Sequence, residues 1–307
     1  MRSLASKCLL VPLLFLMAAR LPVAPCFSQE HARPDTTIWI GQSGGFILEW
    51  TTGDITAAPV SDPSKIIFSA REIALKKFAA FKKENLQEDP AWQCSYSLKF
   101  TVLSFAGSLL SYEENEDSYC GRINGPGWNH PSDQIHYRVI DLKQPSVPIS
   151  LAKFFSEASV LEELLADSTV KEALKNAGKS TEPKTVGDLV KTINEGAEIK
   201  PVKSMAEAPK KCGFVFPEHP FTEFAFHHIE KGKVAVRLSL EPNSGTCHSA
   251  HSQLGILLRI PAPFQSSLTA AQSRTEGFLM EISRRLSAGK ATVFAFETTP
   301  AKQTRKR

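Results

Sequence analysis

The chain has 307 residues, of which 42% are hydrophobic and 22% are charged, with 36 Lys and Arg against 32 Asp and Glu. Residues 1–28 contain three of the basic residues and none of the acidic ones, which leaves 33 basic against 32 acidic residues in the remaining chain. A mature chain of about 280 residues can bury a large core, as one big domain or two modest ones. Its near balance of charge argues against a nucleic-acid-binding face, so we expect no nucleic-acid partner.

The first 28 residues have the three parts of a secretory signal peptide. Arg2 and Lys7 supply positive charge, and Cys8–Ala19 form an apolar run of 12 residues. This run is too short to cross a bilayer, and Arg20 interrupts it. We therefore predict a cleaved leader over residues 1–28, with an uncleaved membrane anchor as the alternative. No transmembrane segment is expected after cleavage.

The sequence leaves the cleavage site and the fate of Cys26 open. Cleavage after Ser28 places small residues at the positions that signal peptidases prefer, and Ala19 and Ala24 are alternatives. Lipidation at Cys26 is a further alternative, although the Pro25 before it is a poor match for a lipoprotein signal. In each case we expect a periplasmic or secreted protein.

Four cysteines follow the leader: Cys94, Cys120, Cys212 and Cys247. An even number of cysteines in an oxidising compartment favours two disulfides, and four cysteines allow three pairings. We predict Cys94–Cys120 and Cys212–Cys247, because each of these pairs brackets one strand-rich segment. Each bond would stabilise the fold by about 3–4 kcal/mol through the chain entropy of the closed loop.

In the N-terminal segment, residues 29–90, the pattern predicts a β-hairpin followed by a helix. Residues 36–40 and 45–51 alternate in polarity on either side of a glycine-rich turn, which is typical of a hairpin. Residues 69–83 carry apolar side chains at helical spacing, with lysines on the other face. Pro90 ends this region.

Strands dominate the next region. Residues 94–105, 109–112 and 134–142 are predicted strands, and residues 121–133 (GRINGPGWNHPSD) form a loop rich in turn-forming residues. We expect the acidic stretch Glu113–Asp117 to form a turn or an edge strand, because charges so close together are usually a solvated face.

A helical block follows. Apolar residues at helical spacing predict a helix over residues 154–165, and Asp167 or Ser168 can cap a second helix directly after it. A third, short helix is predicted over residues 185–195. Residues 197–211 are polar and rich in Pro and Lys, as in a loop or an insertion.

The last third returns to strands. The predicted elements are strands over residues 221–228, 233–240 and 254–260, a helix over 267–287 and a closing strand over 292–297. We group residues 266–300 as a C-terminal helix and strand, and residues 301–307 as a disordered basic tail. Because strands cluster rather than alternate with helices, we predict an α+β fold in which antiparallel sheets pack with a small set of helices and are supported by disulfides.

Histidines form the densest polar cluster of the sequence. They are His248 and His251, next to Cys247, with His219, His227 and His228 upstream. Their spacing matches no strong zinc motif. Within a predicted strand, His227 and His228 should point to opposite faces and should not reach one ion together. We therefore expect no metal site.

Catalytic motifs are equally weak. The acidic stretch Glu113–Asp117 could supply paired carboxylates for glycan hydrolysis, but a solvated face is the commoner meaning. The sequence has no serine nucleophile elbow, no metalloprotease helix motif and no phosphate-binding loop motif. We therefore expect no catalytic residue and no cofactor.

Recognition is predicted to involve the loop over residues 121–133. It combines glycine and proline turn formers with Trp128, Asn129 and His130, and tryptophan is typical of ligand and partner contacts. The alternative is a long, disulfide-anchored turn whose Trp128 packs on its own domain. We take Trp128, Asn129 and His130 as the candidate ligand-binding residues.

The order of several motifs resembles a known family. These motifs are Leu109-Leu110-Ser111-Tyr112, Tyr119-Cys120-Gly121, a glycine-rich loop ending in His130-Pro131, Asp141-Leu142, residues 149–155 (ISLAKFF), Phe224-Ala225-Phe226 and the strand 234–240. They resemble the extracytoplasmic domain shared by the lysozyme-sensing RsiV-type anti-sigma factors and the PdaC-type peptidoglycan deacetylases, where it is the non-catalytic part. The resemblance spans residues 92–262, within a domain that we place at 91–265. It implies an α+β fold and a binding task in the cell envelope.

The chain departs from those relatives in ways that limit what carries over. The loop GRINGPGWNHP replaces their shorter Gly-Gly-Ala-His loop, residues 176–211 look like an insertion, and we find neither a sigma-binding segment nor a deacetylase domain. We therefore predict an exported, non-catalytic binding protein of the cell envelope whose partner is an envelope protein or a cell-wall glycan. The alternative is an envelope hydrolase acting on peptidoglycan or another glycan.

Overall fold

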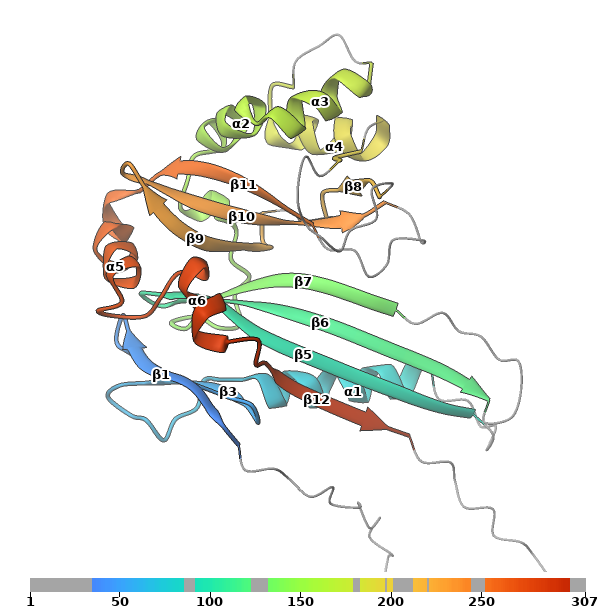
Figure 1. Cartoon of the computed structure of the whole chain (residues 1–307), viewed down its shortest axis with the longest axis vertical. Helices are drawn as coiled ribbons and strands as arrows, with labels where there is room; N and C mark the ends of the chain where they lie inside the picture. The colour runs from blue at the N-terminus through green and yellow to red at the C-terminus, as the bar shows by residue number, and fades with distance from the viewer. Residues whose placement is uncertain are drawn as a thin grey trace, which may run out of the picture. The chain divides into compact units, whose positions relative to one another are not determined.

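The computed structural model describes residues 35–85, 92–122, 132–178, 183–196, 198–200, 212–219, 221–243 and 252–298. Within these ranges the strands pair antiparallel throughout and form three four-stranded sheets, against which six α-helices pack (Figure 1). The predicted α+β class with antiparallel sheets is therefore confirmed.

The first sheet contains the predicted N-terminal hairpin. Its strands are β1 (Thr37–Ser43), β2 (Phe46–Thr51), β3 (Ile55–Pro59) and β4 (Phe68–Ser69), paired in that order, and α1 (Ala70–Asn85) follows directly. The hairpin turn falls on Gly44 and Gly45, whose φ angles of 56° and 85° favour glycine. Gly44 also allows a close approach to Gly107, because a Cβ on Gly44 would lie 2.4 Å from the Gly107 carbonyl carbon.

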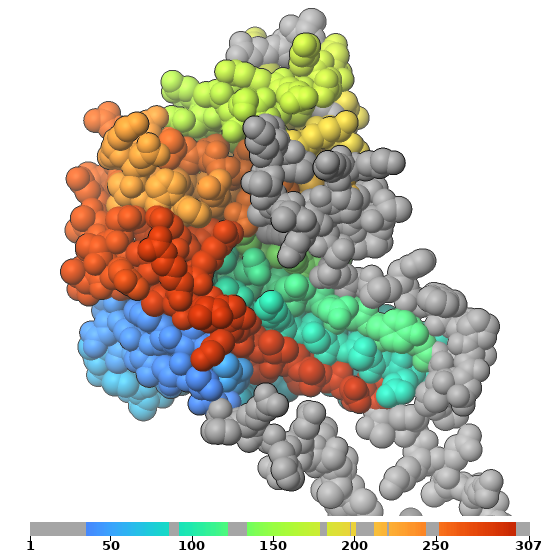
Figure 2. Space-filling view, viewed as in Figure 1, coloured from blue at the N-terminus to red at the C-terminus, as the bar shows by residue number. Residues whose placement is uncertain are grey.

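The second sheet has the strand order β12-β5-β6-β7. Its strands are β5 (Trp92–Ala106), β6 (Leu109–Arg122), β7 (Ser132–Asp141) and β12 (Thr292–Glu297). One face packs against α1 and the first sheet, around buried aromatic side chains such as Trp50, Phe100 and Phe278. The predicted closing strand, β12, is confirmed and lies beside β5 (red beside green in Figure 2).

The acidic stretch Glu113–Asp117, predicted as a turn or an edge, lies instead within β6, between β5 and β7. Glu114 accepts a hydrogen bond from Lys77 of α1 and has only 2% of its side chain exposed. The Lys77 Nζ atom also lies 3.1 Å from Glu116 Oε2. The prediction is wrong because a lysine from another element neutralises these carboxylates inside the sheet.

The third sheet is built around β10, which pairs with each of the other strands. Its strands are β8 (Phe214–Val215), β9 (Phe224–Glu230), β10 (Lys233–Pro242) and β11 (Ser252–Arg259). The apolar face of this sheet is covered by the helical block (Figure 1), which consists of the 3₁₀ turn η1 (Leu151–Lys153), α2 (Glu157–Ala166), α3 (Ser168–Asn176) and α4 (Val186–Gly196). The predicted helices are confirmed, and Asp167 caps α3 by accepting hydrogen bonds from the backbone of Thr169 and Val170.

The helix predicted over residues 267–287 is interrupted. It is replaced by α5 (Ala262–Ser273) and α6 (Met280–Ser287), and the segment between them has left-handed backbone at Arg274 (φ 64°) and Gly277 (φ 70°). Phe278 in this segment exchanges two backbone hydrogen bonds of 2.8 and 2.9 Å with Phe105 of β5. One continuous helix is the wrong expectation because this pairing with β5, which composition cannot reveal, holds the segment out of the helix.

The predicted Cys94–Cys120 disulfide is present and joins residues that face each other across β5 and β6. Cys212 is also disulfide-bonded, and its predicted partner, Cys247, lies outside the described residues. The predicted leader and basic tail lie outside them as well. Among the helices that the structure describes, none combines the length and the apolarity that a bilayer crossing requires.

Candidate functional site

The predicted recognition residues Trp128, Asn129 and His130 lie outside the described residues. The two strands that flank their loop, β6 and β7, are described, and they pair with each other along the sheet. The Cys94–Cys120 disulfide lies close to the end of β6 from which the loop starts. A covalent bond between β5 and β6 thus supports the base of the predicted recognition loop.

One face of the second sheet is exposed near this end. We call it the open face, and its exposed cross-strand neighbours are Ser95, Lys99, Asp117, Tyr119, Val293 and Ala295. Tyr119 and Val293 are the large hydrophobic residues among them, with 45% and 52% of their surface exposed. A rigid sheet that presents an aromatic ring beside aliphatic and charged groups is suited to contacts with a protein or a sugar.

The histidines are only partly described, since His248 and His251 lie outside the described residues and His219 lies in the segment before β9. His227 and His228 are both in β9, and their Nδ1 atoms are 2.7 Å apart. The expectation that these two side chains point to opposite faces is wrong. The pairing register of β9 with β10 shifts beside them, and such a β-bulge changes the regular alternation of side chains.

The contact between the second and third sheets contains polar as well as apolar side chains. Tyr137 of β7 is fully buried there, and burial raises its pKa well above the usual value, with Glu113 adding to the shift and Arg237 opposing it. Burial, together with the positive charge of Arg237, lowers the pKa of His227 to about 4. These groups connect the two sheets through charge and hydrogen-bonding capacity rather than through apolar packing alone.

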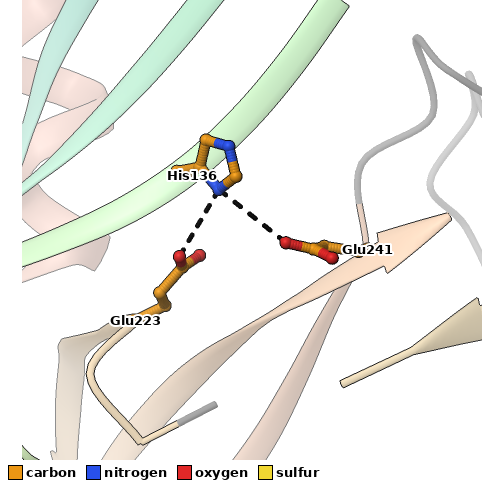
Figure 3. Close-up of side chains that lie close together, drawn as sticks. All are labelled: His136, Glu223 and Glu241. Atoms are coloured by element: carbon orange, nitrogen blue, oxygen red, sulfur yellow. Dashed lines mark ion pairs between the residues drawn. The ribbon is translucent and has the colours of Figure 1, made fainter. Parts of the chain in front are cut away.

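Three side chains that the sequence analysis did not single out meet beside β7 (Figure 3). His136 is on β7, Glu223 directly precedes β9, and Glu241 is near the end of β10. The His136 Nδ1 atom lies 3.4 Å from Glu223 Oε1 and 3.9 Å from Glu241 Oε1. One ligand atom from each residue lies within 4.8 Å of the other two. We call these three residues the carboxylate–histidine cluster.

The members of this cluster differ in burial and in hydrogen bonding. The exposed side-chain fractions are 17% for His136, 7% for Glu223 and 39% for Glu241. Arg138 Nη1 donates to Glu223 Oε1 at 3.0 Å, whereas Glu223 Oε2 and His136 Nδ1 have no hydrogen-bond partner within the described part of the chain. Burial raises the pKa of Glu241; Glu223 and Glu218 raise it further, and His136 and Arg138 oppose the shift.

An imidazole nitrogen and two carboxylate oxygens at these distances can share a proton or ligate a divalent cation. The sequence conceals the cluster, because its members come from separate strands and form no short motif. The one local signal is Glu223, a carboxylate at the start of an otherwise apolar, buried stretch (EFAF).

A cavity of about 300 Å³ lies nearby in the helical block. It is lined by Ala152, Glu157, Val160, Val186, Gly187, Val190, Glu218 and Phe221. Its walls are mostly apolar, and Glu218 is close enough to Glu241 to raise the pKa of that residue. The cavity therefore offers space for a small apolar group in the neighbourhood of the cluster.

Comparison with known protein families finds no family that matches this chain, and comparison with curated protein sequences finds no similar protein. The function has to be inferred from the chain's own residues.

Proposed function

We propose that the protein is an exported, non-catalytic binding protein of the cell envelope, and that its partner is an envelope protein or a cell-wall glycan. The observation that carries this proposal is the open face of the second sheet, next to the disulfide-supported base of the 121–133 loop. The resemblance to the non-catalytic domain of RsiV-type and PdaC-type proteins supports the same task. The disulfide is also compatible with a periplasmic or secreted location.

The open face suits binding because it is both exposed and held in place. Tyr119 lies on β6 opposite Ser95 of β5, and Val293 lies on β12 opposite Lys99 of β5. A partner that docks on such a surface orders few new groups, so less of the contact energy is offset by lost conformational freedom. Tyr119 and the loop residue Trp128 would supply the aromatic contacts that commonly dominate interface energies.

Sedimentation with purified peptidoglycan sacculi and chemical cross-linking to purified envelope proteins test this proposal. We expect saturable binding to one of these partners, weakened at least tenfold by Tyr119→Ala and by Trp128→Ala. Leu75→Ala is the matched control, because Leu75 is 51% exposed on α1, which packs against the other face of the sheet. The proposal is contradicted if both test variants bind as well as Leu75→Ala.

The alternative function is an envelope hydrolase, and the carboxylate–histidine cluster is the observation that favours it. Two carboxylates in different environments can divide acid and base roles in glycan hydrolysis. Glu223, however, is nearly buried and is paired with Arg138, which limits its access to a substrate. We expect no turnover of peptidoglycan fragments. Hydrolysis abolished by Glu241→Gln, or by His248→Ala or His251→Ala, would favour the hydrolase.

A further inference from the structure

The carboxylate–histidine cluster has the spacing of a metal site. Ligands lie about 2.1 Å from zinc, so two ligands at a tetrahedral angle are about 3.4 Å apart. His136 Nδ1 lies 3.4 Å from Glu223 Oε1 and 3.9 Å from Glu241 Oε1. One cation could reach all three side chains after a small adjustment of Glu241, the most exposed of them.

Glu223 has one unsatisfied oxygen in the carboxylate that faces His136. Its side chain is 7% exposed, and its carboxylate points toward His136 (Figure 3). Arg138 satisfies Oε1, but no donor in the described part of the chain reaches Oε2. A buried carboxylate oxygen without a partner is costly, so this atom indicates that a positive group belongs beside it.

His136 can present a lone pair to the same carboxylates. Its Nε2 atom lies 3.4 Å from Oε1 of Gln134, an acceptor to which Nε2 can donate. A neutral imidazole that donates through Nε2 carries a lone pair on Nδ1, and here that lone pair faces oxygens of Glu223 and Glu241. Three electron-rich atoms then converge, and either a proton on Nδ1 or a cation would stabilise them.

We propose that His136, Glu223 and Glu241 bind one divalent transition-metal cation of the zinc or manganese type. A single proton on Nδ1 would satisfy one carboxylate oxygen at a time. A cation contacts both carboxylates at once. The nitrogen ligand favours Zn²⁺ or Mn²⁺ over Ca²⁺, which takes oxygen ligands.

The surroundings of the cluster suit ligation. The hydrogen bond from Arg138 to Glu223 is of the kind that orients metal-binding carboxylates. Glu241 is 39% exposed and gives an ion a route from solvent. The ligands come from β7, from the residue before β9 and from β10, so the ion would join the second sheet to the third.

Equilibrium dialysis of the tag-free protein against Zn²⁺, Mn²⁺ and Ca²⁺ tests the proposal. We expect one equivalent of Zn²⁺ or Mn²⁺ to bind with micromolar or tighter affinity, and Ca²⁺ to bind at least tenfold more weakly. Glu241→Gln should weaken binding at least tenfold, because it removes a ligand. Glu218→Gln is the matched control: it removes the same charge from the neighbourhood of Glu241 without removing a ligand, and affinity should stay within twofold.

Substitution with Co²⁺ provides a second readout. The wild-type Co²⁺ complex should show visible absorption bands that His136→Gln abolishes, and circular dichroism checks that each variant is folded. If a variant fails to fold, one-to-one binding and a rise in the wild-type Tm with Zn²⁺ or Mn²⁺ decide the question. The proposal is overturned if neither metal binds, if Ca²⁺ binds as tightly, or if Glu218→Gln weakens binding as much as Glu241→Gln.

Discussion

Lys77→Met should destabilise the fold by removing the cation that neutralises the acidic residues of β6. Lys77 of α1 donates to Glu114, whose side chain is 2% exposed, and its Nζ atom lies 3.1 Å from Glu116 Oε2. Methionine keeps most of the apolar stem, so the change removes the charge with little loss of packing. The variant leaves Glu114 buried and charged without its neutralising lysine.

The magnitude follows from the burial of the partners. Removing one partner of a buried ion pair costs about 3–5 kcal/mol. Because 32% of the Lys77 side chain and 23% of Glu116 are exposed, water screens part of the interaction, and we expect a loss of about 3 kcal/mol. Lys77→Met combined with Glu114→Leu removes the lysine and the more buried of its two carboxylate partners. This double variant should be within about 1 kcal/mol of the wild type, because an apolar pair can replace a buried ion pair.

Urea denaturation of the oxidised protein, followed by circular dichroism, measures these free energies of unfolding. Lys76→Met is the matched control, because Lys76 is exposed on the same helix and surface substitutions usually change stability by less than about 0.5 kcal/mol. The reasoning is refuted if Lys77→Met loses no more stability than Lys76→Met. It is also refuted if the double variant is as unstable as Lys77→Met alone.

Three further changes test other parts of the fold. Gly277→Ala should cost about 3–5 kcal/mol and Gly289→Ala about 1–2 kcal/mol in urea denaturation. Both glycines have positive φ angles, 70° at Gly277 and 82° at Gly289, but only at Gly277 would a Cβ lie 2.0 Å from a backbone oxygen of β5. Equal losses of unfolding free energy in the two variants would argue against this contact. Replacing Cys94 and Cys120 together with serine should cost about 3.5 kcal/mol, since the bond closes a loop between residues separated by 26 positions; an unchanged urea midpoint would contradict this. His227 has a pKa lowered to about 4 in the folded protein, whereas the unfolded chain binds its proton near pH 6.5. The unfolded state thus binds more protons, so the free energy of unfolding should fall as the pH drops from about 6.5 to 4; His227→Phe should flatten that fall, and an unaltered pH profile would count against it.

The elements with strong local signals could be predicted from the sequence. The alternation around residues 41–44 predicts the first hairpin, because only a few turn types join two antiparallel strands so closely, although β1 continues to Ser43 and the turn falls on Gly44 and Gly45. Asp167 marks the start of α3, because its side chain satisfies backbone N–H groups within three residues. Such interactions are local, so a short window of sequence contains both partners.

Features that depend on distant partners could not be predicted. The acidic strand requires Lys77, which is on a helix that precedes β5. The break between α5 and α6 requires the pairing of Phe278 with Phe105. The meeting of His227 with His228 requires a bulge that forms only when β9 pairs with β10. In each case the structure depends on a distant residue or strand pairing that the local sequence pattern does not contain.

The buried carboxylates Glu114 and Glu223 are each paired with a basic side chain from another element of the fold, and the same requirement for a positive partner identifies the candidate site. Glu114 is neutralised by Lys77, and Glu223 by Arg138, each from another element of the fold. Alternation along a strand shows which face a residue occupies, but it does not identify the residue that neutralises it. Within the described part of the chain, Glu223 Oε2 and His136 Nδ1 still have no hydrogen-bond partner, and Nδ1 lies 3.4 Å from the other oxygen of Glu223. A further positive charge is therefore expected beside these two residues, and the proposed cation would supply it.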